Sequence, residues 1–339
     1  MLGLLPPALL LLFGAWCGTF AGSASFAGST VGAAAMLGMV AAFGAIRRFF
    51  LASALWAAAA ISAWSSPVPR ASWMVLLLLP AFLLLPGAVA RCWSRERDRR
   101  IGLRALATVT LGVSLWALID YSVRDLPRVA MPLGQHNLLA AWLVILLPFS
   151  LLVAREPGLW RWMGLASVLL SAATILATRS LAGNVALAGE ALLALVWFGR
   201  SRRSWKLALV VVAAGLGLFS QRARIAGLLT GQDLSFQGRA VYWEGAWEGF
   251  LARPLLGWGP GSAAWTASAF FDPVPGVTPW GESIFELHSL PLHLAYELGT
   301  LGLAASLGLA GAFAVRRFAE LRSAEDPTFA FAGLCGLLG

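Results

Sequence analysis

Residues 138–154 read LLAAWLVILLPFSLLVA, a run of 17 positions without one charged side chain. A transmembrane helix needs about 20 mostly apolar residues, so this stretch predicts a helix that crosses a membrane. Comparable apolar runs recur along the whole chain. They lie at 1–21, 24–45, 49–64, 71–90, 101–119, 161–178, 181–198, 207–219 and 289–315. The pattern predicts an all-α fold, a polytopic transmembrane helical bundle of about 10–12 spans.

The composition of the 339-residue chain agrees with a membrane protein. Hydrophobic residues make up 59% and charged residues 12%, and the mean hydropathy is +0.77. A soluble domain carries about 25% charged residues, so this chain lacks the polar surface that would cover a water-exposed globule. The abundance of large apolar residues excludes intrinsic disorder, and three cysteines are too few for a disulfide scaffold.

The formal net charge of +9 acts as a topology signal. When the predicted helices alternate in direction, one side of the membrane receives 17 of the 25 basic residues and six acidic ones. The other side receives eight basic and eight acidic residues. Cytoplasmic loops carry the excess of Lys and Arg, so the first side is cytoplasmic. The charge therefore gives no reason to expect a nucleic-acid partner.

Three segments follow from the spacing of the apolar runs. Residues 1–219 form N-terminal transmembrane helices, 220–287 a long extracytoplasmic loop, and 288–339 the C-terminal transmembrane helices. The last apolar run, 328–339, is too short to span a bilayer, so we expect the C-terminal segment to be incomplete. A loop of this length inside a compact protein is usually functional.

Residues 239–252 of this loop carry apolar side chains at helical spacing. Trp243 is followed at four, seven and eight positions by Trp247, Phe250 and Leu251, and Pro254 ends the pattern. We predict an amphipathic helix here. Two interpretations stay open, because the helix can lie on the membrane surface with its Trp residues at the interface, or it can pack on the bundle.

The glycines after this helix, in Gly257-Trp258-Gly259-Pro260-Gly261, predict a tight turn. A phosphate-binding loop is disfavoured, because no Gly-Lys-Ser/Thr follows and no strand precedes the glycines.

Polar residues from separate segments collect on the predicted outer face, where ionisable groups near a membrane are functional candidates. Each has a structural alternative as well: a helix cap, a snorkelling arginine, a solvated first turn, or an internal pair between His293 and Glu297. The histidines are dispersed, so no metal site is expected, and no Gly-x-Ser-x-Gly motif supports a serine hydrolase. The candidates are His136, Asn137, Arg179, Arg239, His288 and Glu297.

In this order, these motifs resemble the O-antigen ligase and O-antigen polymerase family of bacterial membrane proteins. The similarity covers roughly residues 130–315. The stretches that carry it are Gly134-Gln135-His136-Asn137, Thr178-Arg179-Ser180, Arg239-x-x-x-Trp243 with Pro254-x-x-Gly257-x-Gly259-x-Gly261, and His288 followed by Glu297-x-Gly299-x-x-Gly302.

The resemblance implies a glycosyltransferase that moves a glycan from a polyprenyl diphosphate carrier to an acceptor hydroxyl on the periplasmic side of the bacterial inner membrane. The acceptor is a glycolipid, a glycan or a protein. The enzyme would be inverting and metal-independent, with no cofactor. It further implies that His288 acts as general base and that Arg179 and Arg239 bind the diphosphate, with His136, Asn137, Trp243 and Glu297 in supporting roles.

Two alternatives remain open at this point. Within the same family, the protein is an O-antigen or exopolysaccharide polymerase, which differs from a ligase mainly in its acceptor. From another class, it is a transporter or flippase of lipid-linked oligosaccharides. A transporter favours two related halves with helices broken near the membrane midplane, whereas this sequence shows no clear repeat and its polar groups gather on one side.

Overall fold

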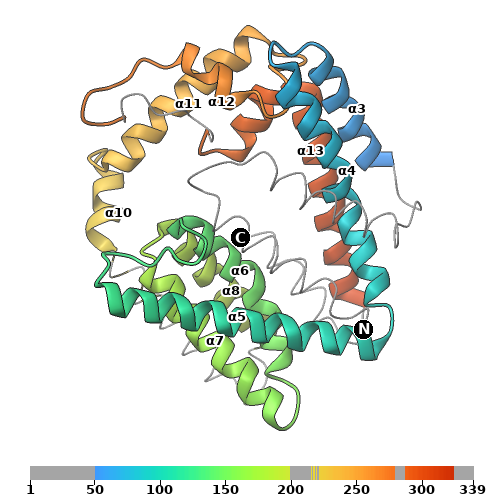
Figure 1. The fold of residues 1–339 in the computed structure, drawn as a ribbon, viewed down its shortest axis with the longest axis vertical. Coiled ribbons are helices and arrows are strands. Elements are labelled where there is room, and N and C mark those ends of the chain that lie inside the picture. The colour runs from blue at the N-terminus through green and yellow to red at the C-terminus, as the bar shows by residue number, and fades with distance from the viewer. Residues whose placement is uncertain are drawn as a thin grey trace. The chain divides into compact units, whose positions relative to one another are not determined.

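The computed structural model describes residues 50–198, 221–278 and 287–323, with the single positions 215, 217 and 219. Every regular element within these residues is a helix, which confirms the predicted all-α fold (Figure 1). In chain order the elements are α3 (Phe50–Trp64), α4 (Pro69–Cys92), α5 (Glu96–Arg124), α6 (His136–Val153), α7 (Leu159–Ala177), α8 (Leu181–Phe198), α10 (Arg222–Leu229), α11 (Leu234–Ala252), α12 (Ala263–Thr266), the 3-10 helix η3 (Ala267–Phe270) and α13 (Leu290–Ser323).

Four of the described helices are long and apolar enough to cross a membrane, namely α5, α6, α7 and the part Leu290–Arg316 of α13. This agrees with the predicted polytopic helical bundle. The runs predicted at 1–21, 24–45 and 328–339, and most of 207–219, lie outside the described residues.

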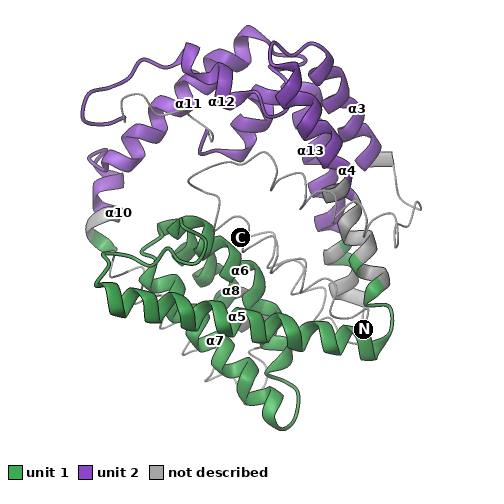
Figure 2. Ribbon diagram, viewed as in Figure 1, with its two compact units in different colours: residues 1–36, 88–222, 316–339 green, residues 37–87, 223–315 purple. Residues whose placement is uncertain are grey.

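The chain forms two compact units, each made of segments that are distant in sequence (Figure 2). Unit 1 comprises residues 1–36, 88–222 and 316–339, and unit 2 comprises residues 37–87 and 223–315. The three segments proposed from the spacing of apolar runs stay a prediction.

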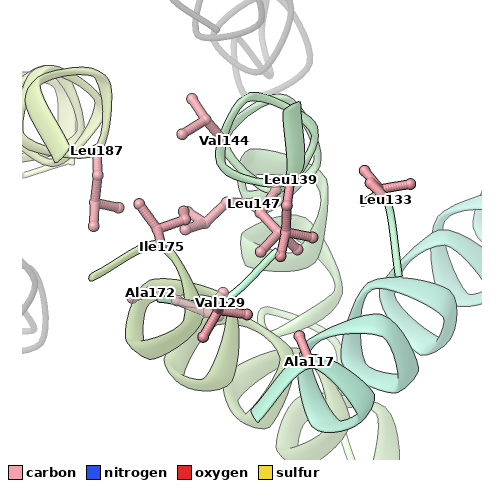
Figure 3. Close-up of a cluster of buried hydrophobic side chains, with 11 residues drawn as sticks. Ala117, Val129, Leu133, Leu139, Val144, Leu147, Ala172, Ile175 and Leu187 are labelled. Carbon is pink, nitrogen blue, oxygen red and sulfur yellow. The ribbon is translucent and has the colours of Figure 1, made fainter. Parts of the chain in front are cut away.

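Unit 1 is built on α5, α6 and α7, which pack on one another, with α8 alongside α6 and α7. Figure 3 shows its buried apolar cluster, to which all four helices contribute. Leu139 and Leu143 of α6 and Ile175 of α7 are fully buried there. Val129 and Leu133, from the connection between α5 and α6, lie in the same cluster, so this connection is part of the core.

Small polar residues bridge the helices of unit 1. Ser114 and Ser171 hydroxyls lie 3.1 Å apart, and those of Ser150 and Ser167 lie 2.9 Å apart, all four residues being fully buried. Between transmembrane helices the driving force is close packing and interhelical hydrogen bonding, because lipid is as apolar as the helix surface. Serines permit a close approach of the helices while each hydroxyl retains a partner.

Residues that the charge pattern assigns to one side of the membrane contact each other in unit 1. Arg104 of α5 forms an ion pair of 2.6 Å with Glu156. Glu156 lies in the connection between α6 and α7. At the opposite ends of the same helices, the Val129 N–H donates to the Ala177 carbonyl at 3.2 Å. Helices that alternate in direction bring these pairs together, as the sorting of charges expects.

In unit 2, α3, α4 and α13 share an apolar core. Leu55, Ala59 and Ala63 of α3 and Leu76 of α4 are buried together with Leu298 of α13. The alanines at positions 59 and 63 lie one turn apart, and their small side chains allow α13 to approach α3 closely.

Helix α13 is broken at Gly299, whose backbone is left-handed (φ 65°, ψ −168°). In an unbroken helix the Thr300 N–H would donate to the Tyr296 carbonyl four residues earlier. Instead it donates to the Pro254 carbonyl at 2.8 Å, and the Tyr296 carbonyl accepts from the Trp258 N–H at 3.0 Å. The loop after α11 thus supplies the hydrogen bonds that the break removes from the helix.

The Glu297 carbonyl, on the same break, accepts from the Gly259 N–H at 2.8 Å and from the Ser62 hydroxyl of α3 at 2.8 Å. Gly257, Gly259 and Gly261 all have positive φ, so the predicted tight turn is confirmed. A Cβ at Gly257 would lie 2.5 Å from the Glu297 carbonyl oxygen, and therefore only glycine allows this approach.

Helix α11 begins at Leu234, five residues before the predicted start, because the Asp233 side chain caps it by accepting from the Phe236 N–H at 2.8 Å. Its end at Ala252 is as predicted. Gly245 and Gly249 pack against Phe271 and Tyr296, so the helix is held to unit 2 by a glycine face.

Most of the apolar residues from which this helix was predicted are not the residues that it buries. Trp247 and Leu251 are 51% and 55% exposed, whereas Phe250 is buried. Helix α11 packs on unit 2 through Gly245 and Gly249. This packing agrees with the second interpretation and leaves the first, a helix that lies on the membrane surface, as a prediction. The membrane-surface contact of Trp247 stays a prediction.

The docking of the loop on the α13 break predicts the effect of Gly257→Ala. Alanine adds the strain of a left-handed backbone and a clash with the Glu297 carbonyl, together about 2–4 kcal/mol. The matched control is Gly231→Ala, because Gly231 also has a φ of 71° but nothing lies within 4 Å of an added Cβ. We expect Gly257→Ala to lower the thermal midpoint of the detergent-solubilised protein well below that of Gly231→Ala. Equal midpoints would contradict the docking.

Candidate functional site

His288 lies two residues before the start of α13, in a left-handed backbone conformation with φ 50°. Its side chain is exposed, while the preceding Leu287 is fully buried. Helix α11 holds it on two sides. The Trp243 indole N–H donates to the His288 carbonyl at 3.3 Å, and the Tyr242 ring lies against the imidazole with centroids 5.6 Å apart and planes tilted by 31°.

Arg239 is placed on α11 so that it shares a face with these two residues. It precedes Tyr242 by three positions and Trp243 by four, the spacings that bring helical side chains together. The residue is half-buried, and none of the described acidic residues forms an ion pair with its guanidinium. Unit 2 therefore presents an arginine and a histidine from distant parts of the sequence on one helix face.

Arg179 occupies the turn between α7 and α8 in unit 1, also with a left-handed backbone (φ 53°). Its neighbours are buried and hydrogen-bonded: the Thr178 hydroxyl donates to the Ile175 carbonyl at 2.6 Å, and the Ser180 hydroxyl accepts from the Gly183 N–H at 3.2 Å. Arg179 itself is exposed. The two hydroxyl residues thus close the ends of both helices and leave the arginine side chain directed outward.

Asn137 ties α6 to this turn. Its side-chain oxygen accepts from the Ser180 hydroxyl at 2.8 Å, so the start of α6 and the start of α8 are joined beside Arg179. His136 lies next to it, with its Nε2 3.1 Å from the Arg128 guanidinium. The sequence left a helix cap as the alternative for this pair, but the cap residue of α6 is Gln135.

The Glu297 carboxylate accepts hydrogen bonds from the backbone of the glycine-rich loop. Its carboxylate oxygens accept from the Gly261 N–H at 2.8 Å and the Ala263 N–H at 3.1 Å, and one of them lies 3.2 Å from His293 Nε2. The residue is 8% exposed. A buried carboxylate with this many donors holds the glycine-rich loop on α13.

The structure brings the sequence-predicted residues together in two groups. Unit 2 joins Arg239, Trp243 and His288 on the face of α11, and Glu297 fixes the loop that follows that helix. Unit 1 joins Asn137 to the turn that carries Arg179.

Sequence reasoning missed Tyr242, and it quoted Ser180 in a motif without predicting its hydrogen bond to Asn137. The spacing of Tyr242 from Arg239 marks the same helix face, but nothing in the sequence indicates that an imidazole 46 positions later lies against it.

Left-handed backbone singles out two of the candidates. Among the described residues, three residues other than glycine have positive φ, and they are Asp125, Arg179 and His288. This conformation costs an L-residue about 1–2 kcal/mol, and such strain concentrates at functional sites. The same part of the chain contains no group of three or more His, Cys, Asp or Glu side chains placed to hold a metal ion.

The described helices that are long and apolar enough to cross a membrane define a polytopic helical membrane protein. Residues 166–307 match the family model described as O-antigen ligase, which confirms the predicted resemblance and points to a multi-pass bacterial membrane protein of the glycosyltransferase type. The matched segment contains Arg179, Arg239, His288 and Glu297, while His136 and Asn137 precede it. No curated protein and no solved structure matches the chain.

The contacts of Glu297 predict a structural effect of Glu297→Gln. An amide retains one acceptor oxygen, but its NH₂ group faces a backbone N–H, so about 1–3 kcal/mol of stability is lost. We expect a lower thermal midpoint of the solubilised protein. Glu248→Gln on the exposed side of α11 is the control and should leave the midpoint unchanged. A Glu297→Gln protein with unchanged stability would show that the carboxylate does not hold the loop.

Proposed function

We propose that the protein is a membrane glycosyltransferase that moves a glycan from a polyprenyl (undecaprenyl) diphosphate carrier to an acceptor hydroxyl at the periplasmic face of the inner membrane, as in O-antigen ligation to a lipid A–core acceptor. The observation that carries the proposal is the shared face of α11, where Trp243 and Tyr242 contact His288 and Arg239 lies one turn away. A base and a fixed cation are the two groups that this reaction needs.

In this proposal, arginine stabilises the diphosphate leaving group. As the bond between the anomeric carbon and the diphosphate breaks, negative charge grows on the phosphate oxygens. Arginine stays charged at any working pH and presents a planar fork that matches these oxygens. We assign this role to Arg239 and also to Arg179, so that both stabilise the transition state more than the ground state.

His288, in this proposal, activates the acceptor hydroxyl, which is the nucleophile. The acceptor hydroxyl oxygen attacks the anomeric carbon, its proton passes to the His288 imidazole, and the bonding pair of the broken C–O bond leaves with the lipid diphosphate. A positioned general base contributes about 10²–10⁴-fold to such a step. One displacement inverts the anomeric configuration, and a diphosphate leaves without a metal ion or other cofactor.

The remaining candidate residues position other residues of the site. Trp243 holds the backbone of His288, Glu297 holds the loop that follows α11, and Asn137, with His136 beside it, fixes the turn of Arg179. A polymerase of the same family would use the same groups with a carrier-linked repeat as acceptor.

The test is transfer in proteoliposomes that hold an undecaprenyl diphosphate-linked oligosaccharide as donor. Lipid A–core glycolipid, a second carrier-linked oligosaccharide and a serine-containing peptide are offered as separate acceptors. Product with the first indicates a ligase, with the second a polymerase and with the third a protein glycosyltransferase. Lack of product with all three, from protein that runs as a single species in detergent, would overturn the proposal.

His288→Asn is the sharpest single variant for this proposal. Asparagine tolerates a left-handed backbone, so the turn is retained while the base is lost. We expect the rate of glycan transfer to fall at least about 10²-fold, with an unchanged thermal midpoint. A His288→Asn protein that transfers at half the wild-type rate or better would exclude His288 as the base.

The arginines are tested by charge and by shape. Arg239→Lys keeps the charge and removes the planar fork, so we expect an intermediate loss of transfer, with Arg239→Ala more severe and Arg179→Asn comparably severe. Asparagine is chosen at Arg179 because of its left-handed backbone. The control is Arg70→Ala, an exposed arginine in the first turn of α4, which should transfer normally. Activity of Arg239→Ala equal to that of Arg70→Ala would remove the assigned role.

A further inference from the structure

Two aromatic side chains lie beside the face of α11 that carries Arg239. Phe236 and Trp243 are seven positions apart, which places them on one side of the helix. Their ring centroids lie 5.8 Å apart with the planes at 86°, an edge-to-face pair. Phe236 is 37% exposed and Trp243 is half-buried, so the pair forms part of the surface.

The polar group of this pair is already engaged. The indole N–H of Trp243 donates to the His288 carbonyl, and phenylalanine has no polar group. What the pair presents to a ligand is therefore the surface of its rings. The electron-rich face of an aromatic ring attracts groups of opposite polarity, and the polarised C–H bonds on the apolar face of a sugar ring are such groups.

The position of the pair restricts which sugar it contacts. Trp243 touches the backbone of His288, and Arg239 lies between the two rings along the helix. A sugar that rests on these rings therefore lies beside the residue that carries the imidazole. The ring whose hydroxyl loses a proton to His288 belongs to the acceptor, whereas the sugar of the donor is the one attached to the diphosphate.

We propose that Phe236 and Trp243 form the binding platform for the acceptor sugar ring, an inference that rests on the proposed function. Because the two rings are perpendicular, the sugar stacks on the face of one ring and contacts the other ring at its side, and its hydroxyl edge is directed toward His288. Phe236 is the informative member, because its ring makes no hydrogen bond to His288 and its backbone N–H is held by Asp233 whatever side chain stands there.

The first test measures contact without turnover. Phe236→p-benzoylphenylalanine places a photoreactive ring on the platform, and irradiation in proteoliposomes containing lipid A–core glycolipid should yield a crosslink to its glycan part. The same substitution at Leu234, which is 61% exposed and points to the opposite side of α11 from Phe236, is the control and should give no glycan adduct. Adducts at Phe236 with phospholipid alone would overturn the proposal and assign this surface to the membrane.

The second test separates acceptor binding from catalysis. Phe236→Ala should raise the KM for lipid A–core glycolipid roughly tenfold, with the KM for the undecaprenyl diphosphate-linked donor and the kcat within about twofold of wild type. Phe236→Tyr should restore the acceptor KM, because tyrosine retains the ring face. The exposed control Leu234→Ala should leave all three constants unchanged.

The outcomes separate this inference from the proposed function. If wild-type protein transfers glycan and requires His288, but Phe236→Ala changes kcat alone or nothing, the platform is wrong and the glycosyltransferase stands. If wild-type protein transfers to none of the acceptors offered, the proposed function fails first. A glycan crosslink at Phe236 in that case would retain a sugar-binding surface without the reaction.

Discussion

One backbone exchange underlies the architecture of unit 2: Thr300 donates to the Pro254 carbonyl, and the Tyr296 carbonyl that it would have bonded accepts from Trp258 instead. Within a membrane, an unsatisfied backbone group costs several kcal/mol, which normally forbids a break in a spanning helix. The break at Gly299 is tolerated because loop 254–261 provides a donor or an acceptor for each of these backbone groups. The glycines on both partners follow from this exchange, since backbone can contact backbone so closely only where no Cβ intervenes.

The exchange fixes more than the loop. Residue 254 follows directly on the end of α11, and the break lies nine residues after the start of α13, which His288 closely precedes. Helix α11 and the start of α13 are therefore held at fixed separation by the loop, by Glu297 on the Gly261 and Ala263 amides, and by Tyr296 packed against Gly249. The contact of Trp243 with His288 joins the same two elements at a second point. Two independent attachments define the orientation of one helix relative to the other.

Much of this arrangement follows from local sequence, and the rest depends on contacts between distant residues. Apolar runs such as 138–154 locate helices because their signal is contained in one segment. The Gly257–Gly261 turn was predictable from its glycines, but its partner on α13 was not, since nothing in a glycine specifies what approaches it. The same reason explains α11, where the conspicuous Trp247 is exposed and the buried face is made of Gly245 and Gly249. Tyr242 was missed because its contact with His288 joins residues that are 46 positions apart.

Arg179 and His288, the two candidate residues with a left-handed backbone, lie beside buried residues. Thr178 and Ser180 are buried on either side of Arg179, and Leu287 is fully buried beside His288. Each of these exposed residues, next to a buried one, has a left-handed backbone. Asparagine or glycine would adopt it at lower cost, so stability does not explain an arginine and a histidine at these positions. In unit 1 the hydrogen bonds of Thr178 and Ser180 offset the strain of the left-handed backbone. In unit 2 the contacts of α11 with His288 offset it. The left-handed backbone is kept at an arginine in unit 1 and at a histidine in unit 2, which is the expected result when the side chain and not the backbone is what must be retained.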